Sequence, residues 1–250
     1  MTSPLDAAGE IAIRSLIEGA PLASSLAAAY KSAGYKLALV GGPVRDAILG
    51  RLGNDLDFTT DALPLESKKI LKIWGENIWD TGIEFGTVAA KRGDTTVEVT
   101  TYRSDKYDPE SRKPEVVYGE NIEGDLSRRD FTVNAMALEL TTKVPEFIDP
   151  FNGLEDLAKK ILRTPTKAEN SFSDDPLRMM RAARFASQLS FEIAPDVLQA
   201  IKDMAGRISI ISAERVRDEF TKILMSSNPR VGITILVETG LAEIVLPEIP

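Results

Sequence analysis

Cysteine and histidine are both absent from this chain of 250 residues. Without cysteine there is no disulfide framework and no thiolate metal site. Without histidine there is neither imidazole catalysis nor an imidazole metal ligand. Any bound metal ion must therefore be held by oxygen atoms, and oxygen ligands favour Mg²⁺, Mn²⁺ or Ca²⁺ over Zn²⁺.

Long apolar runs are missing as well. The longest, such as residues 37–40 and 233–237, are far too short to span a bilayer. The first ten residues include Asp6 and Glu10 but no basic residue, which is unlike a signal peptide. We therefore expect a cytoplasmic protein without a membrane partner. The hydrophobic content of 43% is enough to build one or two hydrophobic cores.

Positive charge is scarce overall, because the formal net charge is -8. Such a balance argues against a nucleic-acid partner. The charge is unevenly distributed, however, since residues 159–230 contain 13 lysines and arginines but only 9 acidic residues. A nucleic acid could therefore bind along this second region.

Hydrophobic periodicity and turn residues predict strands in the first part of the chain and helices in the second. We expect strands at 37–40, 56–60, 87–91 and 95–101, the last two forming a hairpin around Gly93-Asp94. We expect helices at 11–33, 44–49, 65–75, 154–161, 174–189, 195–205 and 213–225. Residues 103–124 are polar and are interpreted as a long functional loop, and residues 131–140 as a further apolar element. This order predicts an α+β fold, with all strands before about residue 150 and an all-helical section after it.

Asp55 and Asp57 are separated by a single residue on a predicted strand. Residues i and i+2 of a strand point to the same face, so Leu56 and Phe58 would face the core. Two neighbouring carboxylates repel each other unless a cation lies between them. The pair is therefore interpreted as a metal site, although an exposed polar strand edge would have the same pattern.

A glycine pair, Gly41-Gly42, follows the predicted strand 37–40 and precedes the predicted strand 56–60. Glycine allows the backbone to approach a ligand closely, and the helix predicted to begin near Pro43 offers free N–H groups to a triphosphate. Arg45 lies one turn into that helix, where its guanidinium can reach a phosphate. The alternative for the glycine pair is an ordinary turn.

A third carboxylate, Glu98, lies on the predicted strand 95–101. If it faces the Asp55 and Asp57 pair, it can complete a metal site or help to deprotonate a hydroxyl group. A solvent-facing strand residue remains the alternative at this position.

Arginine and aspartate recur in two further segments. Arg129 and Asp130 suit a sugar hydroxyl and phosphates together, or form a solvated helix cap. In the second segment, Ser173 is a candidate N-cap with acidic residues and Pro176 in the first turn, and a stripe of polar residues then recurs every three positions: Asp175, Arg178, Arg181 and Arg184. An acceptor and planar donors can together recognise the Watson–Crick edge of a base. A salt-bridged surface would also give this pattern, but arginine without lysine favours a planar partner.

The order of these segments resembles a known family. GGPVRDAILG with DLDF, then EVTTYR, SRRDFTVNAMAL, DPFNGLEDL and DDPLRMMRAARF are similar to the successive motifs of class II tRNA nucleotidyltransferases, which belong with the bacterial poly(A) polymerases in the polymerase-β-like superfamily. The resemblance runs from about residue 37 to 225. One departure is Asp174-Asp175, where the family usually has Glu-Asp.

The resemblance implies four parts: an N-terminal helical segment (1–34), a nucleotidyltransferase head (35–150), a helical neck that recognises the base (151–225) and the start of a helical body (226–250). Because the chain ends after an apolar stretch without a closing cap, we expect it to be a fragment or to continue in the natural protein.

By resemblance, the site residues have four roles. Asp55 and Asp57 match the metal ligands, for Mg²⁺ with Mn²⁺ as a substitute. Gly42 and Arg45 match triphosphate contacts, and Arg129 and Asp130 match the ribose and phosphate motif, which extends to Asn134. Asp175 and Arg178 match the protein template that pairs with CTP or ATP, with Arg181 and Arg184 lining the nucleotide.

The resemblance implies that the function is addition of C, C and A to the 3′ end of tRNA from CTP and ATP, with release of pyrophosphate. Three alternatives remain open: a bacterial poly(A) polymerase, a CC-adding or A-adding specialist, and a catalytically impaired nucleotide- or RNA-binding fragment. A poly(A) polymerase would carry a more basic stretch where residues 81–88 read TGIEFGTV.

Overall fold

The computed structural model describes residues 4–106, 115–119 and 121–247. Its described residues divide into two compact units. Unit 1 comprises residues 4–106, 115–129 and 133–154, and unit 2 comprises residues 130–132 and 155–247. One of the boundaries between the units falls between Arg129 and Asp130, within one of the motifs described above.

Unit 1 is built on a seven-stranded sheet in the order β3-β4-β5-β2-β1-β8-β9. All neighbouring strands are antiparallel except β2 and β5, which are parallel. The strands of this sheet are β1 (Leu37–Val40), β2 (Asp55–Thr60), β3 (Asn77–Trp79), β4 (Thr87–Arg92), β5 (Thr95–Thr101), β8 (Ala137–Glu139) and β9 (Glu146–Ile148). A separate two-stranded ribbon joins β6 (Arg103–Lys106) to β7 (Glu115–Tyr118).

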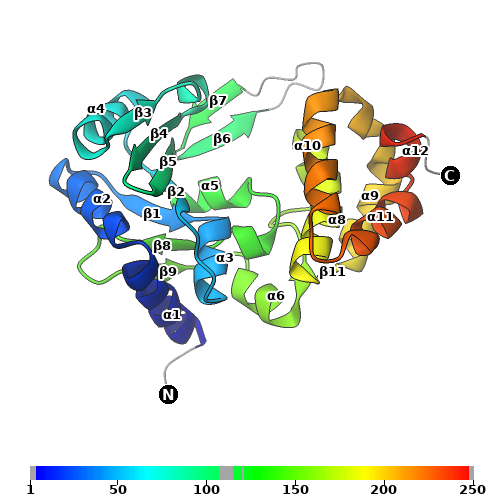
Figure 1. Ribbon diagram of the computed structural model, residues 1–250, viewed down its shortest axis with the longest axis horizontal. Helices are drawn as coiled ribbons and strands as arrows, with labels where there is room; N and C mark the ends of the chain where they lie inside the picture. Colours follow the sequence, from blue (N-terminus) through cyan, green and yellow to red (C-terminus); the bar gives the residue numbers. More distant parts are fainter. Residues whose placement is uncertain (1–3, 107–114, 120, 248–250) are drawn as a thin grey trace. The chain divides into compact units, whose positions relative to one another are not determined.

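Helices cover this sheet, and its central strand β1 is apolar on both faces (Figure 1). All of β1 is buried, and Ala38 and Val40 pack against Leu126 of α5 in one core cluster. The helices of unit 1 are α1 (Pro4–Gly19), α2 (Pro21–Ser32), α3 (Gly42–Ile48), α4 (Pro64–Trp74) and α5 (Ile122–Ser127), with the 3-10 turn η1 (Ile83–Phe85). A second 3-10 turn, η2 (Thr132–Asn134), begins in unit 2 and ends in unit 1. Proline in the first turn of α2, α3 and α4 suits the helix start.

Unit 2 is mainly helical and is organised around α8 (Leu177–Leu189), which packs against α10 and α11. Gly232 makes this packing close, since a Cβ atom there would lie 2.5 Å from Ser187 Oγ and 3.1 Å from the Ala183 carbonyl. The other elements are α7 (Ala168–Asp174), α9 (Pro195–Met204), η3 (Ala205–Ile210), α10 (Ala213–Leu224), α11 (Pro229–Glu238), α12 (Leu241–Val245) and the parallel pair β10 (Ile161–Leu162) and β11 (Glu192–Ile193). Helix α6 (Gly153–Lys159) begins in unit 1 and ends in unit 2.

The structure confirms the α+β fold, the strand at 37–40, the hairpin around Gly93-Asp94 and the helices before residue 76. The first predicted helix is divided at Pro21 into α1 and α2. The predicted loop 103–124 is wrong at both ends, where β6, β7 and the start of α5 lie. Residues 107–114 and 120 lie outside the described residues. The apolar element at 131–140 is a 3-10 turn followed by the strand β8. Both are too short to produce a recognisable hydrophobic periodicity in the sequence.

The helix predicted at 174–189 is also wrong at its start. Ser173 lies in the last turn of α7, Asp175 is extended with φ -143° and ψ 100°, and Pro176 caps α8. The residue before a proline is disfavoured in the helical region, so the chain breaks at Asp175. Strands do occur after residue 150, but β10 and β11 have two residues each. Within the described residues, no helix is both long and apolar enough to cross a membrane.

Candidate active site

Asp55 and Asp57 lie at the start of β2 on its exposed face, whereas Leu56 and Phe58 between and after them are buried. The alternation follows from the two-residue period of a strand. Glu98 of β5 pairs in register with Asp57 and is exposed on its strand as well. The three carboxylates therefore lie on two adjacent strands of unit 1.

The electrostatics of the pair favour a bound cation. Although Asp57 lies on the exposed face of β2, the protein atoms around its carboxylate limit its hydration and raise its pKa to about 6. Arg129 opposes this shift of the pKa, and Glu98 and Asp55 add to it. Like charges in one place disfavour ionisation until a cation compensates them. Among the described residues no three acidic side chains converge closely enough to hold one ion, and Asp55 and Asp57 are two carboxylates that share one face of β2. This donor set fits a hard divalent cation whose remaining ligands are phosphate and water oxygens.

Gly41 brings the backbone against this pair. Its φ of +75° is a conformation that side-chain-bearing residues rarely adopt. A Cβ atom there would lie 2.8 Å from Arg129 Nη1 and 3.9 Å from Asp57 Oδ2. Gly42 begins α3, and a Cβ atom on it would lie 3.4 Å from Arg45 Nη2. Glycine is thus required at Gly41 by its φ and by close approach, whereas the contact at Gly42 is an ordinary van der Waals distance. The pair forms a turn beside two arginines and the carboxylates.

Arg45 is held by protein partners. It is only 7% exposed. Its Nη1 donates to Asn134 Oδ1 at 2.5 Å, and its Nε and Nη2 donate to the two carboxylate oxygens of Asp46 at 3.0 and 2.9 Å. The structure therefore joins the predicted residues Arg45 and Asn134, which lie 89 positions apart.

Arg129 is held by Asp125, a residue that sequence reasoning missed. The Asp125 carboxylate is 1% exposed and accepts hydrogen bonds from Arg129 Nη2 at 3.3 Å and from Arg128 Nη2 at 2.5 Å. It also accepts one from Thr59 Oγ1 at 3.2 Å. Burial alone would raise the pKa of Asp125, but Arg128 and Arg129 outweigh it and hold the pKa below its ordinary range. The signal was available in the sequence, because aspartate with arginines at i+3 and i+4 is a helical ion-pair pattern.

The remaining predicted residues lie in unit 2. Asp130, 7% exposed, accepts a hydrogen bond from Arg181 Nε at 2.9 Å and is also bonded to Arg181 Nη2. Arg184 Nε lies 2.7 Å from Glu219 Oε2, and its guanidinium lies 4.3 Å from the centre of the Phe185 ring. Glu219 of α10 is nearly fully buried and was also missed.

Asp175 and Arg178 do not share a helix, contrary to the predicted stripe, because Asp175 precedes the start of α8. Asp175 Oδ2 pairs with Arg215 Nη2 of α10 at 2.9 Å, and Asp175 Oδ1 accepts from the Leu177 N–H at 3.2 Å. Arg178 Nη1 donates to Ser171 Oγ at 2.8 Å. Both side chains are thus fixed by neighbours within unit 2.

Two family models match the chain. One, described as the poly A polymerase head domain, matches residues 37–163, and the other, described as a probable RNA and SrmB-binding site of polymerase A, matches residues 190–250. The first match covers just over half of the chain and includes the acid pair and the glycine turn. The chain belongs to the class II tRNA nucleotidyltransferase and bacterial poly(A) polymerase family.

Relatives and solved structures agree with this membership. A CCA-adding enzyme of Lactobacillus johnsonii is 43% identical over 212 residues, which is 84% of this chain and 52% of that protein. The crystal structure of the Bacillus stearothermophilus CCA-adding enzyme in complex with CTP has a TM-score of 0.77 at 38% identity, covering 88% of this chain and 52% of the other.

A tRNA nucleotidyltransferase complexed with a primer tRNA and an incoming ATP analog has a TM-score of 0.75 at 29% identity, covering 88% of this chain and 62% of the other. These likenesses confirm the polymerase-β-like head expected from the sequence. The chain spans about half the length of the curated relatives it matches.

Proposed function

We propose that this chain transfers nucleotides from CTP and ATP to the 3′ end of tRNA, adding C, C and A and releasing pyrophosphate. The observation that carries the proposal is the Asp55 and Asp57 pair beside the Gly41-Gly42 turn and Arg129. Relatives named CCA-adding enzymes, and the CTP, ATP analog and primer tRNA named for two similar structures, support this choice of substrates.

Unit 1 carries the phosphate chemistry in this proposal. Family membership implies dependence on a divalent metal, and we propose Mg²⁺, with Mn²⁺ as a substitute, held by Asp55 and Asp57. When bound, the metal ion supplies Lewis-acid polarisation of the triphosphate. Gly41 and Gly42 allow the triphosphate to approach the backbone.

The arginines and Glu98 complete this half of the proposal. Arg45, held by Asn134 and Asp46, and Arg129, held by Asp125, present positive charge to the phosphates. The 3′ hydroxyl attacks the α-phosphate, the bond to the β-phosphate breaks and pyrophosphate leaves. Glu98, in register with Asp57, is the carboxylate proposed to accept the hydroxyl proton.

Unit 2 carries base recognition. Asp175 supplies acceptors and Arg178 supplies planar donors to the Watson–Crick edge of the incoming base. Their present partners, Arg215 and Ser171, set the direction of each side chain. Asp130, Arg181 and Arg184 form the ionic framework that lines the nucleotide in this proposal.

Our proposed division of the chain is an N-terminal segment (1–34), a head (35–150), a neck (151–225) and the start of a body (226–250). The cytoplasmic location of the protein remains a prediction.

The experiment is incubation of the 250-residue chain with a tRNA that lacks CCA, with each labelled nucleoside triphosphate alone and in combination, followed by sequencing of the products. Addition of C, C and A in order supports the proposal. The matched control is Asp57→Ala, which must abolish every product if transfer belongs to this site.

One alternative is favoured by a specific observation, because both matching family models are described by poly(A) polymerase names. Runs of A without C in the same assay would establish that alternative. Addition that stops after CC, or that adds only the final A, would identify a specialist. Absence of any transfer, with nucleotide or RNA binding retained, would identify a binding fragment.

A further inference from the structure

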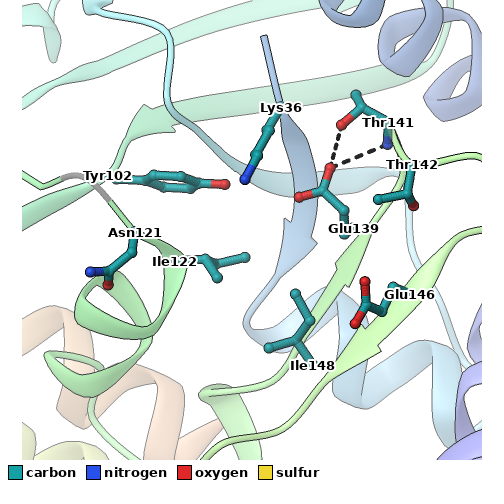
Figure 2. A pocket seen from close by; sticks show the side chains of 9 residues that line it. All are labelled: Lys36, Tyr102, Asn121, Ile122, Glu139, Thr141, Thr142, Glu146 and Ile148. Atoms are coloured by element: carbon teal, nitrogen blue, oxygen red, sulfur yellow. Dashed lines mark hydrogen bonds between the residues drawn. The ribbon is translucent and has the colours of Figure 1, made fainter.

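A cavity of about 340 Å³ opens in unit 1 at the end of the sheet remote from the candidate active site. Lys36, just before β1, and Glu139, the last residue of β8, line it (Figure 2). Gly41 follows the other end of β1. The length of β1 therefore separates this cavity from the glycine turn and the acid pair.

Tyr102 supplies a buried polar group to this cavity. Its side chain is 2% exposed, and its hydroxyl has no hydrogen-bond partner among the described residues. In Figure 2 the hydroxyl points toward Lys36 and Glu139, across the space above Ile122. A buried hydroxyl without a partner costs free energy that a bound ligand can recover.

The surroundings of this hydroxyl are negative. Burial raises the pKa of Tyr102, and Glu139, Asp61 and Asp125 raise it further, so the phenol keeps its proton. Asp125 is paired with Arg128 and Arg129, so Glu139 and Asp61 are the carboxylates that supply the negative potential at this hydroxyl, and such a potential attracts a cation.

Glu139 provides the charge to which a cation would bind. It is 6% exposed, and one of its oxygens accepts hydrogen bonds from the Thr141 N–H and hydroxyl. Within the described part of the chain this carboxylate has no ion-pair partner, and its second oxygen faces the cavity (Figure 2). A buried charge is normally paired. The positive group drawn in Figure 2 is the ammonium of Lys36, an exposed residue that also lines the cavity.

The cavity also has an apolar wall. Ile122, the first residue of α5, and Ile148, the last of β9, both line the cavity, and Figure 2 draws them below the polar groups. We propose that this cavity binds a small aliphatic ammonium ion, with the ammonium between the Glu139 carboxylate and the Tyr102 hydroxyl and the hydrocarbon chain against Ile122 and Ile148. This site is independent of the proposed nucleotide transfer.

The test is isothermal titration calorimetry of the 250-residue chain at neutral pH, with n-butylamine and with butyrate, which has a similar chain and opposite charge. Butylamine is expected to bind once per chain with a dissociation constant on the order of millimolar, as its few atoms allow, and butyrate is expected not to bind. Saturable binding of butyrate, or no saturable binding of butylamine, overturns the proposal.

Variants locate the site. Glu139→Gln should weaken butylamine binding roughly tenfold or more, since it removes a charge-assisted hydrogen bond. Tyr102→Phe should weaken it by a smaller factor while keeping or raising the melting temperature of the free protein, because the hydroxyl it deletes is unpaired. Lys36→Met should leave amine affinity unchanged or increase it, because it removes a competing ammonium.

The control variant is Asp57→Asn, which should leave butylamine affinity unchanged. Loss of binding in this variant, with binding retained in Glu139→Gln, would place the amine at the acid pair and refute the cavity site. If Glu139→Gln does not fold, Tyr102→Phe decides the question, and undiminished affinity in that variant counts against the proposal.

Discussion

Asp125 and Arg129 form an ion pair in which Asp125 Oδ2 lies 3.3 Å from Arg129 Nη2. The same oxygen accepts a hydrogen bond from Thr59, two residues after Asp57 on β2. Arg129 in turn lies against Gly41 and acts on the pKa of Asp57. Asp125 therefore ties the arginine beside the acid pair to the strand that carries the pair.

Asp125→Asn should reduce nucleotide transfer although Asp125 does not reach the acid pair. Loss of the carboxylate leaves Arg128 and Arg129 without their anionic partner, and breaking a buried ion pair typically costs about 3–5 kcal/mol of stability. Steady-state kinetics should show a raised KM for the nucleotide, because Arg129 loses its fixed position. The matched control is Asp94→Asn in the exposed β4–β5 turn. Unchanged kinetics in a folded Asp125→Asn protein would contradict the positioning role.

Acid stability should depend on the same residue. The pKa of Asp125 is lowered in the folded protein, so its contribution is fully present above the unfolded-state value of about 4 and is lost as pH falls through the folded value. Thermal unfolding measured from neutral pH downward should therefore show a steep loss below about pH 4. In Asp125→Asn this loss should be smaller, and equal slopes for the two proteins would refute the assignment.

Asp55→Ala and Asp57→Ala should abolish transfer while the fold is kept. Both side chains are exposed on β2, and removing one carboxylate relieves repulsion in the metal-free protein. The melting temperature without metal should hold or rise, and added Mg²⁺ should raise it in the wild type more than in either variant. Transfer at the wild-type rate by either variant would rule out the metal-ligand role.

A divalent cation should be required, and Mn²⁺ should replace Mg²⁺. The chain contains no cysteine or histidine, so Zn²⁺ cannot find the nitrogen or sulfur ligands it prefers. The measurement is transfer rate against metal concentration after treatment with EDTA. Full activity in excess EDTA would be incompatible with the proposed chemistry.

Arg178→Ala should reduce selectivity among bases more than the transfer rate. A bidentate contact to a base edge is worth about 1–3 kcal/mol of discrimination, and Asp175→Ala should give a similar loss from the acceptor side. The two changes should be non-additive because they act on one base.

The measurement for both variants is steady-state kinetics with CTP, ATP, UTP and GTP on one primer. The control is Arg217→Ala, an exposed arginine on α10 that pairs with Asp218 on the surface. Equal losses for all four nucleotides in Arg178→Ala would mean that Arg178 supports the helix through Ser171 instead.

The parts of this protein that follow from local pattern were predictable. The apolar run 37–40 is β1, and the turn at Gly93-Asp94 joins β4 and β5. Asp55 and Asp57 share a face of β2 because the side chains of a strand alternate with a two-residue period. A turn at the glycine pair could be placed because glycine allows a positive φ and proline suits the first turn of the helix that follows. These properties depend on residues within a few positions of one another.

Partners that lie far apart in the chain could not be predicted in this way. Arg45 meets Asn134, Arg181 meets Asp130, and Arg184 meets Glu219 only after the chain has folded. The cavity at Tyr102 likewise joins residues from 36 to 148. The composition shows only that arginines and acidic residues are present. Tertiary packing decides which of them come within about 3 Å of one another and so pair when buried. The local periodicity of the sequence does not contain that information.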